Sequence, residues 1–436
     1  MMEVTLKYGH GTQTATIPDE NYLGELNVAT DLPGAEDPYA EVLRSLRDPI
    51  GTPPLAEMVK GVQSVAVVVN DHTRKTPTRL ILPPVLDELN EAGIPDSAVT
   101  VIFGCGTHRD VTQEEADYLL GNHCCDRVKW ENHQHLGDDL VNLGDNGLGN
   151  TVWINKTFVE ADFRLLIGDI EFHYYAGYSG GRKSVLPAVA GDKTIQHNHA
   201  QLLHPNASTG NLVDNPIHED MVASARMAKT DFIVNTVNNT KREIVRSFAG
   251  DLEGAHLEGI KMVDSMYKVN LPQLADIVVV SSGGAPKDLD IYQGTKSVDN
   301  ALRAVRKGGA LVALLEAPEG LGHQVFNSWI REYGTLEELE DQVKHAFVLG
   351  GHKAYYIRKY NAHAKVFLVT SLDHDMVEGI LGLTKPADFQ EAIDMAFDHV
   401  GHDAKVLVIP VGDKILPCLP EGECEPVAEN GPKAQA

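Results

Sequence analysis

The sequence is poor in basic residues and in long apolar runs. Its 37 lysines and arginines stand against 62 aspartates and glutamates, a formal net charge of -25, which argues against nucleic acid or an anionic membrane as a partner. No apolar run reaches the roughly 18 residues that a membrane helix needs, and the first residues lack the core of a signal peptide. We therefore expect a cytoplasmic protein in which an anionic substrate needs a local basic site.

Metal-binding cysteine motifs and dinucleotide-binding motifs are also lacking. The five cysteines include no CxxC pair, which disfavours a zinc finger. No GxGxxG motif follows the first predicted strands, which disfavours an ordinary NAD dehydrogenase.

Continuous runs of valine, isoleucine and leucine alternate with helix-like segments along the chain. Such runs are typical of parallel strands buried on both faces. The alternation predicts an α/β fold with mainly parallel sheets flanked by helices. We predict strands at 64–70, 99–103, 163–170, 277–281, 310–315, 366–370 and 406–411, and helices that include 78–92, 113–120, 297–306 and 336–346.

The length of 436 residues and a second series of strands indicate two domains. A helix-like stretch at 252–274 precedes the strand that opens the second series, so we place the boundary near residue 272. The N-terminal domain then spans 1–272 and the C-terminal α/β domain spans 273–415. Residues 416–436, rich in proline, glutamate, glycine and alanine, are predicted to be a partly disordered tail.

The densest chemistry lies between residues 163 and 199. A buried strand, a glycine-rich turn and the expected start of a helix follow one another there, which is a natural site for an anionic ligand. Imidazoles and an amine nucleophile in the same stretch suggest catalysis with a metal or a bound nucleotide. The residues concerned are His173, Gly180, Gly181, Arg182, Lys183, His197 and His199.

Polar groups follow four of the predicted strands, and ligands of open α/β sheets bind at the carboxyl ends of strands. The four segments could therefore converge on one active site in the cleft between the domains. Arg74 offers a planar fork for a carboxylate, and Lys296 could neutralise an oxygen. His108 and His173 could each move a proton. This set suits a small 2-hydroxy or 2-keto acid, and two histidines fit a reaction on either enantiomer.

Each position also has a purely structural explanation. Asp71 and Thr73 could cap the helix predicted from residue 78. His108 could be a hydrogen-bonded turn residue, and His173 a satisfied core histidine. Lys183 could be a solvated charge at a helix end. Four strand ends that all carry basic or imidazole groups are harder to explain in this way.

Several segments together resemble the nickel-dependent lactate racemase family, whose wider membership includes 2-hydroxyacid racemases and epimerases. The resemblance runs roughly from residue 1 to 415 and implies an isomerase acting on lactate or a related 2-hydroxyacid. The segments that carry it are DHTRKTP at 71–77, GTHR at 106–109, HYYAGYSGGRKSVLPAVAG at 173–191, Asn198-His199, and YQGTK at 292–296.

The resemblance makes 1–272 the cofactor-binding domain and implies a nickel-pincer nucleotide, a pyridinium-3-thioamide-5-thiocarboxylic acid mononucleotide bound covalently to Lys183. His199 would ligate the nickel, because soft sulfur and imidazole ligands suit this metal. His108 and His173 would be the two acid/base residues. The other implied contacts are Asp71, Thr73, Gly180 and Gly181 with the cofactor, and Arg74, Tyr292, Gln293 and Lys296 with the substrate.

The implied mechanism is a hydride shuttle through a 2-keto acid. One histidine takes the hydroxyl proton while the C2 hydride moves to the cofactor, and the hydride then returns to the opposite face of the keto acid. Cofactor-maturation proteins are the implied partners besides the substrate. Some members carry a tryptophan around 353–356, where this chain has Lys-Ala-Tyr-Tyr, so we expect a pocket of different size or polarity.

Two other functions remain open. A zinc-dependent hydrolase or lyase would use His173, His197 and His199, although no carboxylate of the HExxH type accompanies them. A non-catalytic nucleotide-binding or cofactor-carrier protein would use the same glycine turn without turnover.

Overall fold

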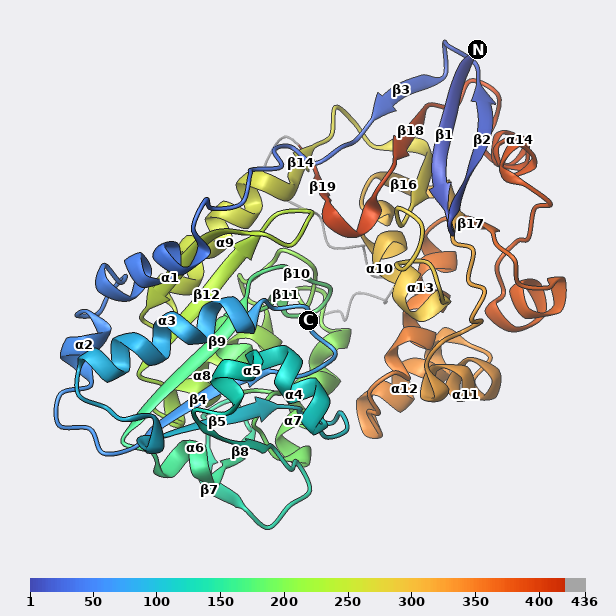
Figure 1. The fold of residues 1–436 in the computed structure, drawn as a ribbon. Coiled ribbons are helices and arrows are strands. Elements are labelled where there is room, and N and C mark those ends of the chain that lie inside the picture. Colours follow the sequence, from blue (N-terminus) through green and yellow to red (C-terminus); the bar gives the residue numbers. More distant parts are fainter. Residues whose placement is uncertain (420–436) are drawn as a thin grey trace. The chain divides into compact units, whose positions relative to one another are not determined.

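A computed structural model describes residues 1–419. The chain forms two compact units, which we call the inserted unit, residues 30–266, and the outer unit, residues 1–29 with the chain from residue 267 onward. Both are α/β layers with mainly parallel sheets flanked by helices, as predicted (Figure 1). Within residues 1–419, no helix has the length and hydropathy that a membrane span requires.

The inserted unit is built on a six-stranded sheet with the order β13-β12-β9-β4-β5-β6. All neighbours are parallel except β13, which runs antiparallel to β12 at one edge. The three central strands coincide with predicted strands to within one residue. The strands are β4 (Val65–Asn70), β5 (Val99–Gly104), β6 (Lys129–Asn132), β9 (Phe163–Asp169), β12 (Phe232–Asn238) and β13 (Ile244–Gly250).

Both faces of this sheet are buried, which explains the unbroken apolar runs. Alternate residues of β4, such as Val67, pack with helices that include α1 and α3 in one core. The opposite face is covered in part by η2, a short 3-10 helix that contacts β4, β9 and β12. The helices of the unit are α1 (Pro38–Arg47), α2 (Leu55–Met58), α3 (Thr78–Glu91), α4 (Gln113–Leu120), α5 (Asn122–Cys125), α6 (Lys156–Glu160), η2 (Gly181–Ser184), α7 (Asp192–Ala200), α8 (Pro216–Met227) and α9 (Gly254–Tyr267).

The outer unit holds a fully parallel five-stranded sheet with the order β17-β16-β15-β18-β3. Its strands are β3 (Tyr22–Glu25), β15 (Ala275–Ser281), β16 (Val305–Leu314), β17 (Lys365–Val369) and β18 (Val406–Ile409). Its helices are α10 (Ile291–Leu302), α11 (Gln324–Glu332), α12 (Leu336–His345), α13 (His352–His363) and α14 (Phe389–Val400).

The first 29 residues belong with the C-terminal half of the chain, although the sequence alone suggested the N-terminal half. β1 (Met2–Tyr8) and β2 (Gly11–Ile17) form a hairpin whose apolar face, including Leu6 and Ile17, joins the core under the outer sheet. β3 then pairs in parallel with β18. The alternating pattern of β1 fits a strand with one buried face, but a local pattern does not specify which core receives that face.

The beginning of the predicted tail is ordered in a strand. Leu416–Cys418 forms β19, which pairs in parallel with β14 (Lys268–Asn270). The rest of the predicted tail, 420–436, lies outside the described residues.

Candidate active site

Three of the predicted site residues of the inserted unit lie at the carboxyl ends of three adjacent strands. Asp71 follows β4, His108 follows β5, and His173 comes just after β9 in the short strand β10 (Phe172–His173). Because β9, β4 and β5 are neighbours and parallel, their ends share one edge of the sheet. The predicted convergence of these three strand ends is therefore present within this unit.

Asp71 and His108 form a hydrogen-bonded pair. The Asp71 carboxylate is 2% exposed and its Oδ2 lies 2.6 Å from His108 Nδ1. Oδ1 accepts hydrogen bonds from the backbone N–H and the hydroxyl of Thr73, at 3.1 and 2.7 Å. Burial opposes ionisation of the carboxyl, but the hydrogen bond and charge of His108 hold the pKa of Asp71 below its ordinary value. An ionised Asp71 fixes the proton on His108 Nδ1 and leaves Nε2 for proton exchange.

The alternative role of Asp71 and Thr73 as helix caps does not apply. The residue before α3 is Pro77, and no side chain caps that helix. Arg74 is exposed, and its charge acts on both Asp71 and Lys183. Arg74 is therefore close enough to both Asp71 and Lys183 for its charge to lower their pKa values.

Tyr175 lies at the centre of a second cluster. Its ring centroid is 4.4 Å from that of His173 and 5.2 Å from that of His199, edge-on in both cases. The ammonium nitrogen of Lys183 lies 5.6 Å from the same ring centroid. Three predicted site residues thus share one aromatic neighbour. Sequence reasoning missed Tyr175, although it stands in the quoted HYY segment.

Lys183 and His199 both sit in an environment that disfavours positive charge. Burial lowers the pKa of Lys183 well below its ordinary value, and the nearby charges of Arg182 and Arg74 lower it further. Burial, with the charge of Lys183, lowers the pKa of His199 to about 3. His199 Nδ1 lies 3.0 Å from the carbonyl oxygen of Ile195. The proton is therefore on Nδ1, and Nε2 keeps the lone pair that a metal requires.

The glycine turn differs from the prediction. Gly180 and Gly181 have φ of 76° and 53°, and a Cβ on Gly180 would lie 2.7 Å from the side-chain oxygen of Asn235. That oxygen accepts the backbone N–H of Gly181 at 2.7 Å. Only the four-residue η2 follows, and α7 begins at Asp192. The helix expected directly after the glycines is therefore a single 3-10 turn, and the Gly181 N–H is held by Asn235 of β12.

The predicted YQGTK segment lies in the outer unit, in the first turns of α10 rather than in a loop. Asp290 caps this helix by accepting the backbone N–H of Gln293 at 2.7 Å, and it also accepts the Gln293 amide at 2.8 Å. The ring of Tyr292 stacks on His323 with centroids 4.9 Å apart. The glycine and polar residues of this segment have the composition of a turn, so the sequence did not predict a helix here. The residue that marks the start of the helix is its cap, Asp290.

Lys353, at the position where some family members differ, contacts the Tyr292 side chain. Its ammonium nitrogen is 5.5 Å from the Tyr292 ring centroid. Burial lowers the pKa of Lys353 to about 8, with the charge of Lys296 acting in the same direction and that of Asp299 opposing it. Tyr355 of the same helix is buried, and its ring packs against that of Tyr356 with centroids 5.4 Å apart. Lys353 belongs to the stretch 353–356, in which some family members carry a tryptophan, but the sequence analysis assigned no role to it.

The histidine set proposed for a zinc enzyme is not assembled. His199 is buried and His197 is exposed, although both lie in α7. Among residues 1–419, no group of three histidine, cysteine or acidic side chains could hold a metal. A zinc hydrolase built on His173, His197 and His199 therefore lacks its ligand geometry.

Comparison with known protein families covers most of the chain. Residues 8–210 match the model of the lactate racemase N-terminal domain, and residues 271–416 match that of the lactate racemase C-terminal domain. A lactate racemase of Lactiplantibacillus plantarum is 35% identical, over 94% of this chain and 99% of its own length. One from Thermoanaerobacterium thermosaccharolyticum is 32% identical, over 95% and 99% respectively.

Solved structures agree with these matches. The lactate racemase apoprotein from T. thermosaccharolyticum superposes with a TM-score of 0.87 at 31% identity, covering 96% of this chain and all of that one. A Thermotoga maritima protein, at 21% identity and a TM-score of 0.63, covers 89% of this chain and shares the fold. With both domain models matched and relatives aligned over nearly their full length, the chain belongs to the lactate racemase family, a family of isomerases.

Proposed function

We propose that this chain racemises a 2-hydroxyacid, lactate or a close analogue, at the carboxyl end of the inserted unit's sheet. The observation that supports this most strongly is the cluster of Lys183, His199 and His173 around Tyr175. It combines a lysine with a lowered pKa, an imidazole whose Nδ1 faces a backbone carbonyl, and a second imidazole for proton transfer. Relatives named lactate racemases make lactate the first substrate to test.

The residues of this cluster fit the nickel-pincer nucleotide that the family resemblance implies. The lowered pKa of Lys183 favours the neutral, nucleophilic amine from which a thioamide forms. His199 offers Nε2 to the nickel because its Nδ1 proton is held by the Ile195 carbonyl. When bound, this cofactor supplies a hydride acceptor, which no side chain can provide. Cofactor-maturation proteins are then the partners of the chain.

The side chains would bind the acid and move its hydroxyl proton. Arg74 suits the substrate carboxylate because its guanidinium is a planar double donor. His108, oriented by Asp71, would take or return the hydroxyl proton for one enantiomer, and His173 would do so for the other. Gly180, Gly181 and Thr73 are proposed to contact the cofactor, and Tyr292, Gln293 and Lys296 the substrate. Replacement of Tyr292, Gln293 or Lys296 should therefore raise the KM for the substrate.

The test begins with the chain produced together with cofactor-synthesis enzymes. Intact-mass measurement, a nickel assay and the interconversion of D- and L-lactate are then made on the same sample. Lys183→Ala should lose the added mass and the activity together. Lys193→Ala, which alters an exposed lysine ten residues away, is the matched control and should keep both. Full activity in Lys183→Ala would refute the covalent tether.

Failure of the wild-type chain would refute the function itself. If the loaded, nickel-containing protein interconverts neither lactate nor other 2-hydroxyacids, racemisation is not its activity. A carrier of the cofactor would give that result, with the added mass and the nickel present but no turnover.

A further inference from the structure

Arg182, next to the proposed cofactor lysine, is a buried cation without an acidic partner. Its residue is 1% exposed, and no ion pair involving it occurs within residues 1–419. Nη2 donates to the carbonyl oxygen of Ala176 at 2.6 Å, and Nη1 lies 3.3 Å from that of Gly180. Nε has no hydrogen-bond partner. Burying a charge costs several kcal/mol unless it is compensated, so two carbonyls leave this guanidinium incompletely satisfied.

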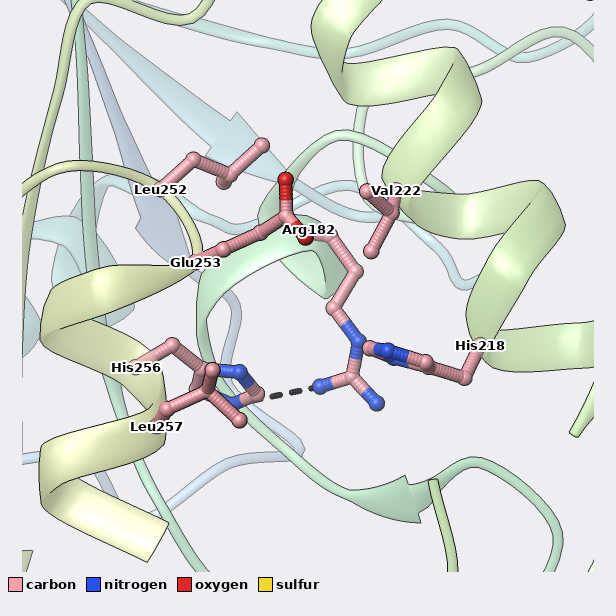
Figure 2. Close-up of a pocket in the computed structure, with 7 residues that line it drawn as sticks. All are labelled: Arg182, His218, Val222, Leu252, Glu253, His256 and Leu257. Carbon is pink, nitrogen blue, oxygen red and sulfur yellow. Dashed lines mark hydrogen bonds between the residues drawn. The ribbon is translucent and has the colours of Figure 1, made fainter. Parts of the chain in front are cut away.

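Two histidines flank this guanidinium, and Figure 2 shows it between their rings. His256 Nε2 lies 3.2 Å from Arg182 Nη1 and 2.8 Å from the carbonyl oxygen of Ser179. One nitrogen cannot both accept from the arginine and donate to the carbonyl, so one of these contacts lacks a hydrogen bond. His218 Nδ1 is buried without a partner. The cluster therefore has donors in excess of acceptors.

The three side chains line a small cavity of about 30 Å³, which is room for a single ion or one to two water molecules. The remaining lining is Val222, Leu252, Leu257 and Glu253. Glu253 is the one acidic residue among these lining residues, and its carboxylate forms an ion pair with Arg226, in which Nη2 lies 2.8 Å from Oε1. Burial and the charge of Arg182 lower the pKa of His218 to about 3, so His218 adds a neutral N–H donor rather than a second charge.

We propose that this cavity binds one small monovalent anion, with chloride as the physiological candidate, held by the Arg182 guanidinium and the His218 ring. An anion there would supply the negative charge and the acceptor that the cluster lacks. The cavity is too small for a 2-hydroxyacid or a phosphate ester. Its apolar walls favour a weakly hydrated ion such as a halide. The site stands apart from the racemase proposal, since it requires neither cofactor nor turnover.

The test compares thermal unfolding in sodium chloride and in sodium gluconate at equal ionic strength. A specific site stabilises the folded chain by RT ln(1 + [L]/Kd) in chloride, which at ten times Kd raises Tm by about 3–6 °C for a unit of this size. Crystals soaked in sodium bromide should show an anomalous peak beside the Arg182 guanidinium. Equal Tm values in both salts, or bromide bound only elsewhere, would overturn the proposal.

Two variants and one control separate this site from general salt effects. Arg182→Met removes the charge at similar length and should abolish the difference between the salts. Val222→Phe fills the cavity without touching the guanidinium, so it tests the same point if Arg182→Met does not fold. Arg47→Met removes a half-exposed arginine paired with Glu88 and Glu91 and should keep the difference. Chloride-specific stabilisation that survives in Val222→Phe would count against the cavity.

Discussion

Replacement of Asp71 by asparagine is the sharpest test of how the proposed acid/base residue His108 is held. The carboxylate lies 2.6 Å from His108 Nδ1 and is 2% exposed. Asparagine keeps the size and can still accept from Nδ1, but it removes the charge. Hydrogen bonds to charged groups contribute about 1.5–3 kcal/mol. At roughly 1.4 kcal/mol per tenfold change in rate, kcat should fall by about 10- to 150-fold.

The assay follows each lactate enantiomer separately with stereospecific detection, and rates are expressed per bound nickel. The equilibrium constant of a racemisation is unity, so kcat/KM must fall equally in both directions. Any asymmetry between the two bases then appears in kcat and KM individually. Asp110→Asn, an exposed carboxylate two residues from His108, is the control and should keep the wild-type rate.

Two outcomes would refute this reasoning. If Asp71→Asn retains more than half of the wild-type kcat per nickel, the pair does not position His108. If nickel and added mass are lost while the rate per nickel is unchanged, Asp71 binds the cofactor, as the family resemblance implied, and has no role in proton transfer.

Three further predictions follow from the same geometry. His199→Ala should lower nickel retention without unfolding the chain, whereas His197→Ala, at an exposed position of the same helix, should retain nickel; the opposite result would mean that the segment is aligned wrongly with the family. His108→Ala and His173→Ala should each slow racemisation at least about a hundredfold with nickel still bound, and near-normal turnover in either would make that histidine structural. The apoprotein should lose stability between pH 7 and pH 5. Burial lowers the pKa of His133 to about 4 and that of His199 to about 3, so in this pH range these histidines become protonated in the unfolded chain but stay neutral in the folded chain. The loss should be roughly 2 kcal/mol per histidine at pH 5, measured as a falling urea midpoint, and a flat midpoint would contradict it.

The sequence predicted strands such as β4, β5 and β9 because they are apolar runs buried on both faces, but it missed β12, whose run is interrupted by Asn235. β4 is a continuous apolar run up to Asn70, and β9 is one interrupted by Arg164. Apolar runs of this length that end at polar turns are typical of buried strands. The strand ends then identified Asp71, His108 and His173, because parallel neighbours bring those ends together. This part of the candidate site could be predicted from local pattern and sheet geometry.

The parts that the sequence did not predict depend on partners distant in the chain. Gly180 and Gly181 are followed by a 3-10 turn because Asn235, more than fifty residues later, takes the Gly181 N–H. The surroundings of Arg182 come from α8 and α9, through His218 and His256. The helix that carries Tyr292 begins at Ile291 after its cap Asp290, and its glycine and polar residues gave it the composition of a turn. Local composition cannot report such contacts.

The inserted unit is one uninterrupted stretch of the chain, and the outer unit is formed by the residues that precede and follow it. The two ends of the inserted unit are joined directly, since the N–H of Thr30 donates to the carbonyl oxygen of Met266 at 3.2 Å. During synthesis, residues 30–266 can therefore complete their own core as soon as they leave the ribosome, whereas β3 must wait for β18, more than 380 residues later, to gain its sheet neighbour. Residues 22–25 thus gain their sheet neighbour only after the inserted unit has been made. An expressed fragment of residues 30–266, with adjoining ends and a complete sheet, should fold by itself.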